Sequence, residues 1–370
     1  MSTNYDFAII GGGNAGLSLA RNLTYSDNSK KIIVIEPIEP INKQANWCSW
    51  LNEADLIKHK NSIKGVWDRW KIIHHNEAIL HQSSIYQYAC IDSSRYLIEI
   101  EQLLLDGRVE IAREGVQSII SENNQIICDS RTINAMHIYD SRPPKIKENS
   151  LIQHFSGIEV ELSDGIKNHE FVTLMDFRVD QKNGLHFIYA LPFSSTRIFV
   201  ESTVISKKVN EKSWYKEKIL QWLKDQNLKF DAIISEEHGV IPQYTQEYNN
   251  TQIHQIGSRG GATRLASGYA FHNINKQIDM LSKNIENNEH RVPEVMSRFL
   301  INMDTIFNAV IINNPSYSPD IFIRMAKSIS GDQFAEFMLN KANINTWYKV
   351  VKNMPKTPFI KESIKRFFGQ

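Results

Sequence analysis

Apolar residues gather in short runs at the start of the chain, and their spacing changes twice within 36 residues. Residues 5–10 form a run typical of a buried β-strand, and residues 17–23 carry apolar side chains at helical spacing. A second apolar run follows at residues 31–35. This pattern predicts a strand, a tight turn, a helix and a second strand, which is the opening unit of a nucleotide-binding sheet.

The predicted turn holds three glycines in the spacing Gly-x-Gly-x-x-Gly, from Gly11 to Gly16. The first allows a tight turn, the second lets backbone N–H groups approach a pyrophosphate, and the third lets the helix pack close to the strand. Glu36 ends the second strand, where its carboxylate can accept hydrogen bonds from a ribose and would repel a 2′-phosphate. We therefore predict a site for FAD or NAD rather than NADP, in preference to a plain βαβ turn. The residues expected to contact this cofactor are Gly11, Gly13, Asn14, Ala15, Gly16 and Glu36.

The following hundred residues mix β-rich and helical patterns. A polar loop that carries two tryptophans is expected at residues 42–50. Serines followed by apolar residues at helical spacing predict a helix over residues 93–104. Strands are expected at residues 66–73, 85–91, 109–111, 125–128 and 136–140.

A change of pattern begins near residue 152, where β-rich segments follow one another without helices. The runs 185–193 and 196–205 predict an antiparallel pair joined by a turn at Ser194 and Ser195. A helix is expected over residues 214–224. Such a sheet, inserted into a nucleotide-binding domain, is typical of a substrate domain.

The predicted strand at residues 253–256 returns the chain to the first domain and leads into Gly257, Gly260 and Gly261, which we expect to let a cofactor approach the backbone. From residue 273 onward the pattern is mostly helical. The predicted fold is therefore α/β, with a Rossmann-like cofactor-binding domain, an inserted antiparallel β-sheet substrate domain and a helical C-terminal region. The predicted limits are 1–150 and 246–285 for the cofactor-binding domain, 151–245 for the substrate domain and 286–370 for the helical region.

Composition narrows the function classes. The 370 residues are 42% hydrophobic with a net charge of +1, which suits a globular protein and gives no sign of a nucleic-acid partner. Three widely separated cysteines without a Cys-x-x-Cys motif predict neither a disulfide scaffold nor a zinc site, and His74, His75 and His81 suggest no ligand set. No signal peptide is expected, and no apolar run approaches the roughly 18 residues that span a bilayer. We therefore expect a cytoplasmic protein without a metal.

Eight stretches of the chain, in this order and spacing, resemble the bacterial lycopene β-cyclases, which are FAD-dependent carotenoid cyclases. The stretches are residues 5–19, 47–50, 139–143, 153–161, 175–178, 187–203, 239–242 and 256–271. The resemblance implies a flavin hydroxylase-like architecture with FAD in the cofactor-binding domain. It also implies an acid-catalysed, non-redox reaction: an acyclic end of lycopene is protonated, a neighbouring double bond attacks the cation, and loss of a proton leaves a β-ionone ring. Reduced FAD is required, and NAD(P)H would supply the reduction.

The resemblance also points to candidate catalytic carboxylates. The acid-bearing motif of the family, Phe-Leu-Glu-Glu-Thr, reads Phe-Val-Glu-Ser-Thr here, so Glu201 is the expected acid and Ser202 removes a second carboxylate. A strand with alternating exposure would by itself leave Glu201 in solvent. Asp176 is a second candidate, with an ion pair to Arg178 as the alternative. Candidate substrate-binding aromatic residues are Trp47, Trp50, Phe193 and Tyr269.

Two alternatives stay open at this point. Another flavoprotein of the same superfamily, such as a hydroxylase, a halogenase or a prenyl reductase, would share most of these patterns, although the Trp-x-Trp-x-Ile-Pro motif of halogenases is missing. A carotenoid carrier that binds flavin is a non-enzymatic alternative. Because lycopene and related acyclic carotenoids dissolve in membranes, we expect peripheral attachment to the inner membrane. Residues 358–368, which place Ile360, Ile364, Phe367 and Phe368 beside basic residues, form either an interfacial helix or a tail packed on the domain.

Overall fold

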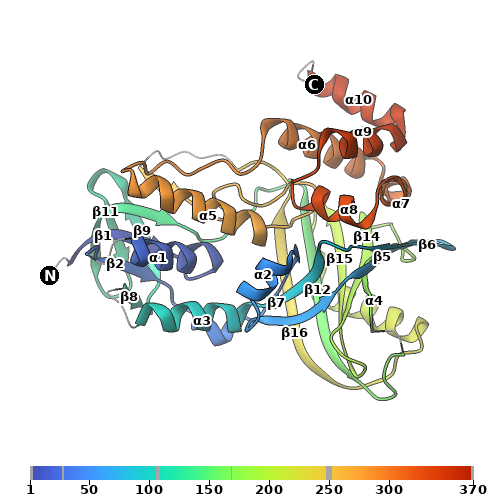
Figure 1. Ribbon diagram of the computed structural model, residues 1–370, viewed down its shortest axis with the longest axis horizontal. Coiled ribbons are helices and arrows are strands. Elements are labelled where there is room, and N and C mark those ends of the chain that lie inside the picture. Colours follow the sequence, from blue (N-terminus) through green and yellow to red (C-terminus); the bar gives the residue numbers. More distant parts are fainter. Residues whose placement is uncertain (1–2, 27–28, 106–108, 168, 247–251, 368–370) are drawn as a thin grey trace.

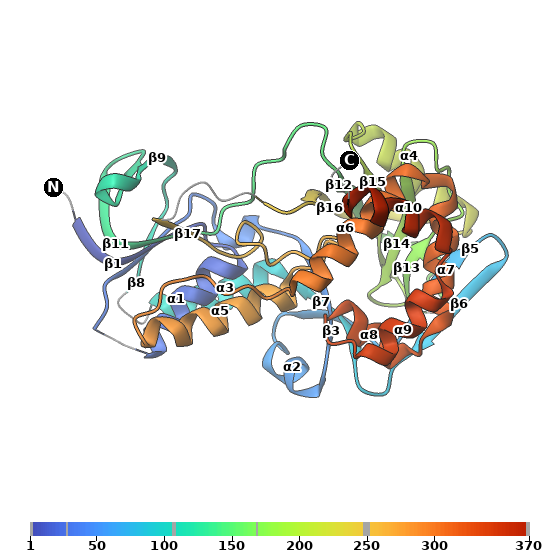
Figure 2. The same ribbon diagram turned by 90° about the horizontal axis from the view of Figure 1, so that it is seen from above.

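The computed structural model describes residues 3–26, 29–105, 109–167, 169–246 and 252–367. Two large sheets, a small third sheet and a cluster of C-terminal helices make up the chain (Figure 1). The first and second sheets lie at opposite ends of the molecule, and the C-terminal helices lie over the second sheet (Figure 2).

The first sheet is the predicted Rossmann-like sheet. Its central strands are parallel, and apolar side chains pack on both faces of the sheet. The helices α1 (Asn14–Ser26), α3 (Ser93–Leu105) and α5 (Phe271–Glu286) lie together on one face of it. The strand order is β8 (Val109–Ala112), β2 (Ile32–Ile35), β1 (Thr3–Ile10), β11 (Thr132–Asp140), β10 (Gln125–Cys128) and β9 (Val116–Ile120), with β17 (Ile253–Gln255) paired to β11.

The second sheet has one face covered by helix α4 (Lys212–Asp225) and the other turned toward the C-terminal helices (Figure 1). The predicted antiparallel pair is confirmed as β14 and β15. The strand order is β16 (Phe230–Pro242), β12 (Ile152–Leu162), β15 (Arg197–Ser206), β14 (Leu185–Pro192), β13 (Val172–Asp176), β5 (Arg69–His74) and β6 (Glu77–Gln82).

The predicted limits of the domains stay a prediction. The sheets do not follow these limits near the start of the chain, because part of the segment 1–150 joins the second sheet. Strands β5 and β6 come from the segment assigned to residues 1–150, yet β5 pairs in parallel with β13 of the second sheet. The indole of Trp70 on β5 is fully buried in the core beneath this sheet, which explains why the segment leaves the first sheet.

The expected polar loop at residues 42–50 is wrong for its second half. Strand β3 (Asn46–Leu51) pairs with β7 (Gln87–Asp92), and β7 also pairs with β4 (Ile63–Trp67) to form the small third sheet. A short helix α2 (Glu53–Lys58) follows β3. Because Trp47 and Trp50 lie on this strand, they have fixed positions between the two large sheets.

The C-terminal region is helical, as predicted. Its packing on the second sheet is aromatic: the ring centroids of Phe177, after β13, and Phe322 are 5.3 Å apart. The buried guanidinium of Arg264 pairs with Asp304 at 3.3 Å and ties these helices to the segment that returns to the first sheet. The helices are α6 (Arg298–Asn313), α7 (Ser318–Ser328), α8 (Gly331–Met338), α9 (Ile344–Asn353) and α10 (Lys356–Phe367), and short 3₁₀ turns lie at Pro40–Asn42, Ser121–Asn123 and Pro315–Tyr317.

Candidate active site

A single cavity of about 870 Å³ joins the glycine-rich turn of the first sheet to the C-terminal helices. It begins at Gly11 and Gly13, crosses the open face of the second sheet, and ends between α6, α9 and α10. Five of the predicted cofactor residues therefore lie on the walls of the same cavity as Glu201, although they come from a different sheet: Gly11, Gly13, Asn14, Ala15 and Glu36. Gly16 does not line the cavity but lets α1 pack close to the turn.

The glycine-rich turn has the geometry expected of a dinucleotide-binding turn. Gly11 has a φ of +97°, and a Cβ on Gly16 would lie 1.9 Å from the carbonyl oxygen of Gly11. A Cβ on Gly13 would meet no atom within 4 Å, so open space lies beside this backbone. Gly11 and Gly16 therefore determine the shape of the turn, and the open space beside Gly13 leaves room for a ligand.

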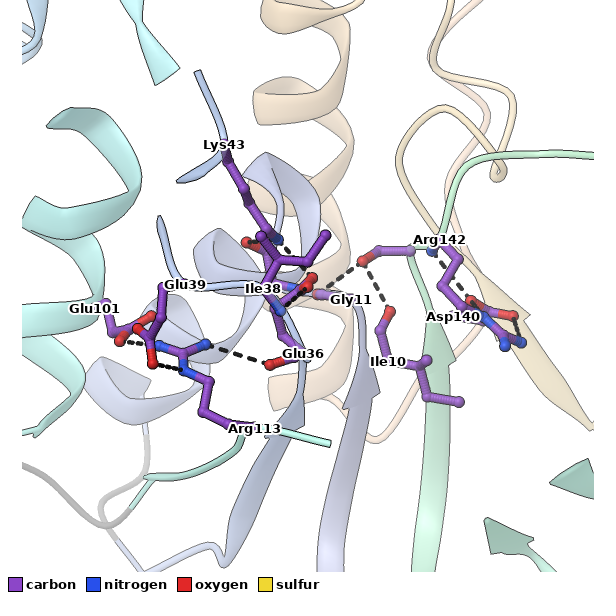
Figure 3. Close-up of polar contacts among 12 residues, drawn as sticks. Ile10, Gly11, Glu36, Ile38, Glu39, Lys43, Glu101, Arg113, Asp140 and Arg142 are labelled. Carbon is purple, nitrogen blue, oxygen red and sulfur yellow. Dashed lines mark hydrogen bonds and ion pairs between the residues drawn. The ribbon is translucent and has the colours of Figure 1, made fainter. Parts of the chain in front are cut away.

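The carboxylate of Glu36 is held by three donors (Figure 3). Its Oε2 accepts from the N–H of Gly12 at 2.7 Å and pairs with Nζ of Lys43 at 2.5 Å, and its Oε1 accepts from the N–H of Ile38 at 2.9 Å. Burial by itself would raise the pKa of Glu36, but Lys43 and the backbone donors hold the pKa below its ordinary value. Glu36 is therefore an anion at neutral pH.

A buried amide near the turn fits a cofactor phosphate. Asn14 begins α1, lines the cavity and is 6% exposed, and its Nδ2 atom has no hydrogen-bond partner in the described part of the chain. An N–H donor at a helix N-terminus is suited to an anionic oxygen. Nearby, Arg142 lines the cavity and pairs with the buried Asp140 at 2.7 Å (Figure 3). Arg259 also pairs with Asp140, at 2.9 Å. These residues fit a dinucleotide pyrophosphate.

The glycines of the return segment lie behind the cavity wall rather than on it. The N–H of Gly257 donates to Oε1 of Gln277 at 2.8 Å, and a Cβ on Gly260 would lie 2.4 Å from the carbonyl oxygen of Gln255. Gly261 has a φ of +76° and turns the chain. The wall itself is formed by Ser258, Ser267 and Gly268. The glycines predicted for direct contact therefore shape the loop instead.

Glu201 faces the cavity from the middle of β15. Its side chain is 9% exposed, and its Oε1 accepts a hydrogen bond from the hydroxyl of Thr203 at 2.5 Å. Burial raises the pKa of Glu201 to about 8, and the nearby carboxyl group of Glu237 adds to the rise. At neutral pH Glu201 is therefore mostly a neutral carboxylic acid, and the solvated position that alternating exposure would give is not what the structure shows.

A second carboxyl group, which the sequence did not reveal, lines the cavity at Glu237. Its Oε2 accepts from the backbone N–H and from Nδ2 of Asn46, both at 3.0 Å. Burial raises the pKa of Glu237 to about 7, while the donors of Asn46 and the charge of Lys64 oppose the rise. Glu237 lies on β16, two residues before the resembling stretch 239–242 but outside it, and its pairing with β12 brings it to the site.

Asp176 and Ser202 lie away from the cavity. Asp176 is fully buried, its two oxygens bind the guanidinium of Arg178 at 2.9 and 2.7 Å, and Nε1 of Trp222 donates to it at 3.0 Å. The structure therefore favours the ion pair over a catalytic role for Asp176. Ser202 points to the opposite face of the sheet from Glu201 and bonds Nε2 of His186 at 2.9 Å. A carboxylate at this position would not reach the cavity.

The predicted substrate-binding aromatic residues separate into two groups. Trp47 and Tyr269 line the cavity, whereas Trp50 is buried in the core and Phe193 packs near Trp67 beneath the ammonium of Lys64. Three hydroxyl groups form a chain on the cavity wall, because Tyr88 bonds both Tyr189 at 2.8 Å and Tyr269 at 2.7 Å.

The far end of the cavity is apolar and comes from the C-terminal helices. Its side chains are mainly methionine, aliphatic and aromatic residues on α6, α7, α9 and α10, whose contribution the sequence did not predict. They include Met303, Ile306, Phe307, Phe322, Met325, Trp347, Val350, Met354, Phe359 and Ile360. Within the described residues, no group of three or more His, Cys, Asp or Glu side chains is placed to hold a metal ion.

Comparisons with solved structures show a shared fold. The chain aligns with a geranylgeranyl bacteriochlorophyll reductase-like protein from Thermoplasma acidophilum at a TM-score of 0.63 and 12% identity, covering 98% of this chain and 96% of that one. It aligns with p-nitrophenol 4-monooxygenase from Pseudomonas putida at a TM-score of 0.58 and 11% identity, covering 97% and 99%. The predicted flavin hydroxylase-like fold class is confirmed.

Comparisons of sequence identify the family. Lycopene beta-cyclase from Pantoea ananas is 24% identical over 254 residues, which cover 65% of this chain and 63% of that protein. The chloroplastic lycopene beta cyclase of Solanum lycopersicum is 25% identical over 264 residues, covering 64% and 51%. The match thus spans between half and two thirds of these relatives. A family model described as lycopene cyclase protein matches residues 6–308, and this chain therefore belongs to the lycopene cyclase protein family.

Proposed function

We propose that the protein is a lycopene β-cyclase, which converts the acyclic ends of lycopene into β-ionone rings, through γ-carotene to β-carotene, without net oxidation or reduction. The observation that carries the proposal is a neutral, buried Glu201 on the wall of an apolar cavity that begins at a dinucleotide-binding turn. Membership of the family supports the same activity.

The chemistry requires a proton donor for an alkene, which is a very weak base. A carboxylic acid that is still protonated at neutral pH and lies in a mainly apolar cavity meets this requirement. Glu201 is such a group. The cation that forms needs nearby electron density, and the aromatic ring of Trp47 and the tyrosine rings on the wall supply π faces toward it.

FAD is the proposed cofactor. Gly11, Gly13 and Asn14 would hold its pyrophosphate and Glu36 its ribose, because the open backbone, the unpartnered amide and the ionised carboxylate match these groups. Reduced FAD supplies a fixed negative charge that stabilises a cation in a low-dielectric cavity. NAD(P)H is the proposed reductant.

A peripheral position on the cytoplasmic face of the inner membrane is proposed for substrate uptake. No helix in the described part of the chain is long and apolar enough to cross a bilayer. The cavity ends at Val351 and Ile360, which are 45% and 55% exposed, and beside them Ile344 and Tyr348 of α9 are also exposed. Residues 341–367 hold seven lysines and arginines and one acidic residue. Such a basic surface with exposed apolar side chains suits an anionic bilayer.

The position of α9 can be tested by a double variant, Ile344→Asp with Tyr348→Asp. Binding to liposomes that contain anionic lipid should fall several-fold, because two charges would enter the interface. Leu80→Asp, a change of an apolar residue that is 54% exposed on β6, serves as the control and should bind as the unaltered protein does. Equal binding of both variants would contradict the proposed docking surface. Of the tail residues expected to contribute, Ile360 and Ile364 are exposed on α10, whereas the side chain of Phe367 and all of Phe368 lie outside the described residues.

The activity itself is tested by anaerobic incubation of the purified protein with FAD, NADPH and lycopene in liposomes, followed by pigment chromatography. We expect γ-carotene and β-carotene to form without stoichiometric consumption of NADPH. A hydroxylase or halogenase would need O₂, and a prenyl reductase would consume NADPH in proportion to product. Unchanged lycopene in the presence of bound, reduced flavin would overturn the proposal.

A further inference from the structure

Glu201 and Glu237 stand in one row across three strands of the second sheet. Gly157 on β12 is directly opposite Glu201 on β15 and directly opposite Glu237 on β16. Residues directly opposite one another in antiparallel strands point to the same face, so both carboxyl groups point into the cavity. With strands about 4.8 Å apart, their Cα atoms lie about 10 Å from each other.

The residue between them has no side chain, and the packing requires this. A Cβ on Gly157 would lie 2.3 Å from the ring of Phe199 and 3.2 Å from Cβ of Glu201. The buried ring of Phe199 therefore occupies the place that a side chain at position 157 would take, and β12 contributes no side chain between the two glutamates. Because both carboxyl groups line the same cavity, a substrate end that lies in this part of the cavity would be within reach of both.

These two acids also differ from the other acids of the cavity. Four carboxyl side chains from the described residues line it: Glu36, Glu201, Glu237 and Asp304. Glu36 is paired with Lys43, and Asp304 is paired with Arg264. Within the described chain, Glu201 and Glu237 form no ion pair, so no salt bridge holds either of them in the ionised form.

Hydrogen bonding assigns different protonation states to the pair. Glu201 accepts one hydrogen bond, from the neutral hydroxyl of Thr203. Glu237 accepts two on the same oxygen from Asn46, and the ammonium of Lys64 bonds Oδ1 of that asparagine at 3.2 Å. Two N–H donors and a nearby cation favour the ionised form. The pKa values follow this difference, about 8 for Glu201 and about 7 for Glu237.

Other titratable groups near the pair are poor proton acceptors. The buried hydroxyl groups of Tyr88, Tyr189 and Tyr269 have pKa values raised by burial, so they stay neutral. Lys64 is bound to Glu159 at 2.6 Å. His238 also lines the cavity, and burial lowers its pKa.

We propose that Glu237 is the catalytic base that removes the proton from the ring cation, opposite Glu201 as the acid. The inference rests on the proposed cyclase activity. Glu201 transfers its carboxyl proton to the terminal double bond, and the electron pair of the neighbouring double bond forms the ring C–C bond. The ring cation then loses a ring proton to the carboxylate of Glu237, which leaves the new double bond. Return of that proton from Glu237 to Glu201 restores the starting state, so atoms and charge balance.

The test compares Glu237→Gln with Glu236→Gln in the holoprotein under the anaerobic liposome assay. Gln at 237 keeps the shape and an acceptor for Asn46 but cannot take a proton, so kcat should fall by about 10²-fold or more. The flavin content and the KM for lycopene should not change. Glu236 is exposed and pairs with Lys216 on the other face, so its variant should behave as the unaltered protein does.

The pH profile supplies a second readout. The rate of the unaltered protein should rise with pH as the base ionises and fall as the acid loses its proton. The two apparent pKa values of this profile describe the pair together rather than either residue alone. Glu237→Gln should lose the rising limb and keep the falling one, and Glu237→Asp should retain the rising limb at reduced kcat. If Glu237→Gln cyclises lycopene within about threefold of the unaltered rate, Glu201 acts alone and the inference is overturned. Failure of the unaltered protein to form any ring would instead overturn the proposed function.

Discussion

Glu36 and Glu201 are side chains of the same type at two places on one cavity wall, but Glu36 is an anion at neutral pH and Glu201 is mostly neutral. Glu36 is surrounded by Lys43 and two backbone N–H groups, which hold its pKa low despite burial. Glu201 has a single hydroxyl donor and no cation, so burial raises its pKa to about 8. One end of the cavity thus holds a permanent anion suited to sugar hydroxyls, and the other holds a neutral acid suited to protonating carbon.

The largest effect should come from removing the acid. Glu201→Gln keeps the volume and the hydrogen bond from Thr203 but has no proton to give, so we expect the rate of ring formation to fall by about 10²–10⁴-fold. Flavin binding and lycopene binding should persist, measured by flavin absorbance and by pigment retention. A Glu201→Gln variant that binds lycopene and still cyclises it would show that Glu201 is not the acid. If the protein is instead a carotenoid carrier, the unaltered protein would bind lycopene and form no ring.

A third buried carboxylate, Asp176, sharpens the comparison because it contributes to stability rather than to the site. Asp176→Asn should lower the free energy of unfolding by about 2–4 kcal/mol, since it leaves Arg178 and Trp222 with a neutral partner. The guanidinium is 42% exposed and can be solvated, which limits the loss. Denaturant unfolding measures this change. The kcat of the folded variant should equal that of the unaltered protein, and a selective loss of kcat would restore Asp176 as a catalytic candidate.

The two glutamates should also act in opposite directions on the pH dependence of stability. The pKa of Glu201 is higher in the folded than in the unfolded chain, so its stabilising contribution is complete below about pH 4.5 and is lost as pH rises to about 8. The pKa of Glu36 is lowered, so its contribution is present above its unfolded pKa and is lost at acidic pH.

Thermal unfolding measured from pH 5 to pH 9 should therefore show a decline toward alkaline pH that is shallower in Glu201→Gln. Glu237 adds to the same decline, so some of it should remain in the variant. An identical slope in the two proteins would mean that Glu201 is not neutral in the folded state.

The smallest of these effects concerns the cofactor. Glu36→Gln should raise the Kd for FAD about 10-fold, because a charge-assisted hydrogen bond becomes a neutral one. The kcat at saturating FAD should not change, which separates binding from catalysis. Glu39→Gln, a change of an exposed residue that pairs with Arg113, is the control and should leave the Kd as it is. An unchanged Kd in Glu36→Gln would place the ribose elsewhere.

Local patterns of sequence predicted the parts of the fold that depend on local geometry. The turn from Gly11 to Gly16, the pair β14 and β15, and helix α3 all follow from short-range spacing of glycine and apolar residues, and the structure has them. Glu201 was found through a resemblance rather than through its pattern, and its burial depends on helices that follow it by a hundred residues.

The remaining features depend on contacts between distant segments. Residues 46–51 become a strand because β7 pairs with them, and no alternation of apolar and polar residues marks that strand beforehand. Glu237 reaches the cavity through the register of β16 on β12, which a single sequence does not encode at any one position. Helices α6, α9 and α10 are recognisable as helices, but which of their faces lines a cavity follows only from how they pack.

Since side chains alternate between faces along a strand, a one-residue insertion or deletion at the centre of β12 would change the pairing partners on both of its edges. The β12 side chains beyond the change would exchange faces, and Gly157 would no longer lie opposite both Glu201 and Glu237. We expect the length of this strand to tolerate far less variation than the loops at its two ends. A family member of altered strand length would then need a glycine at a shifted position of this strand to keep the same packing between its two carboxyl groups.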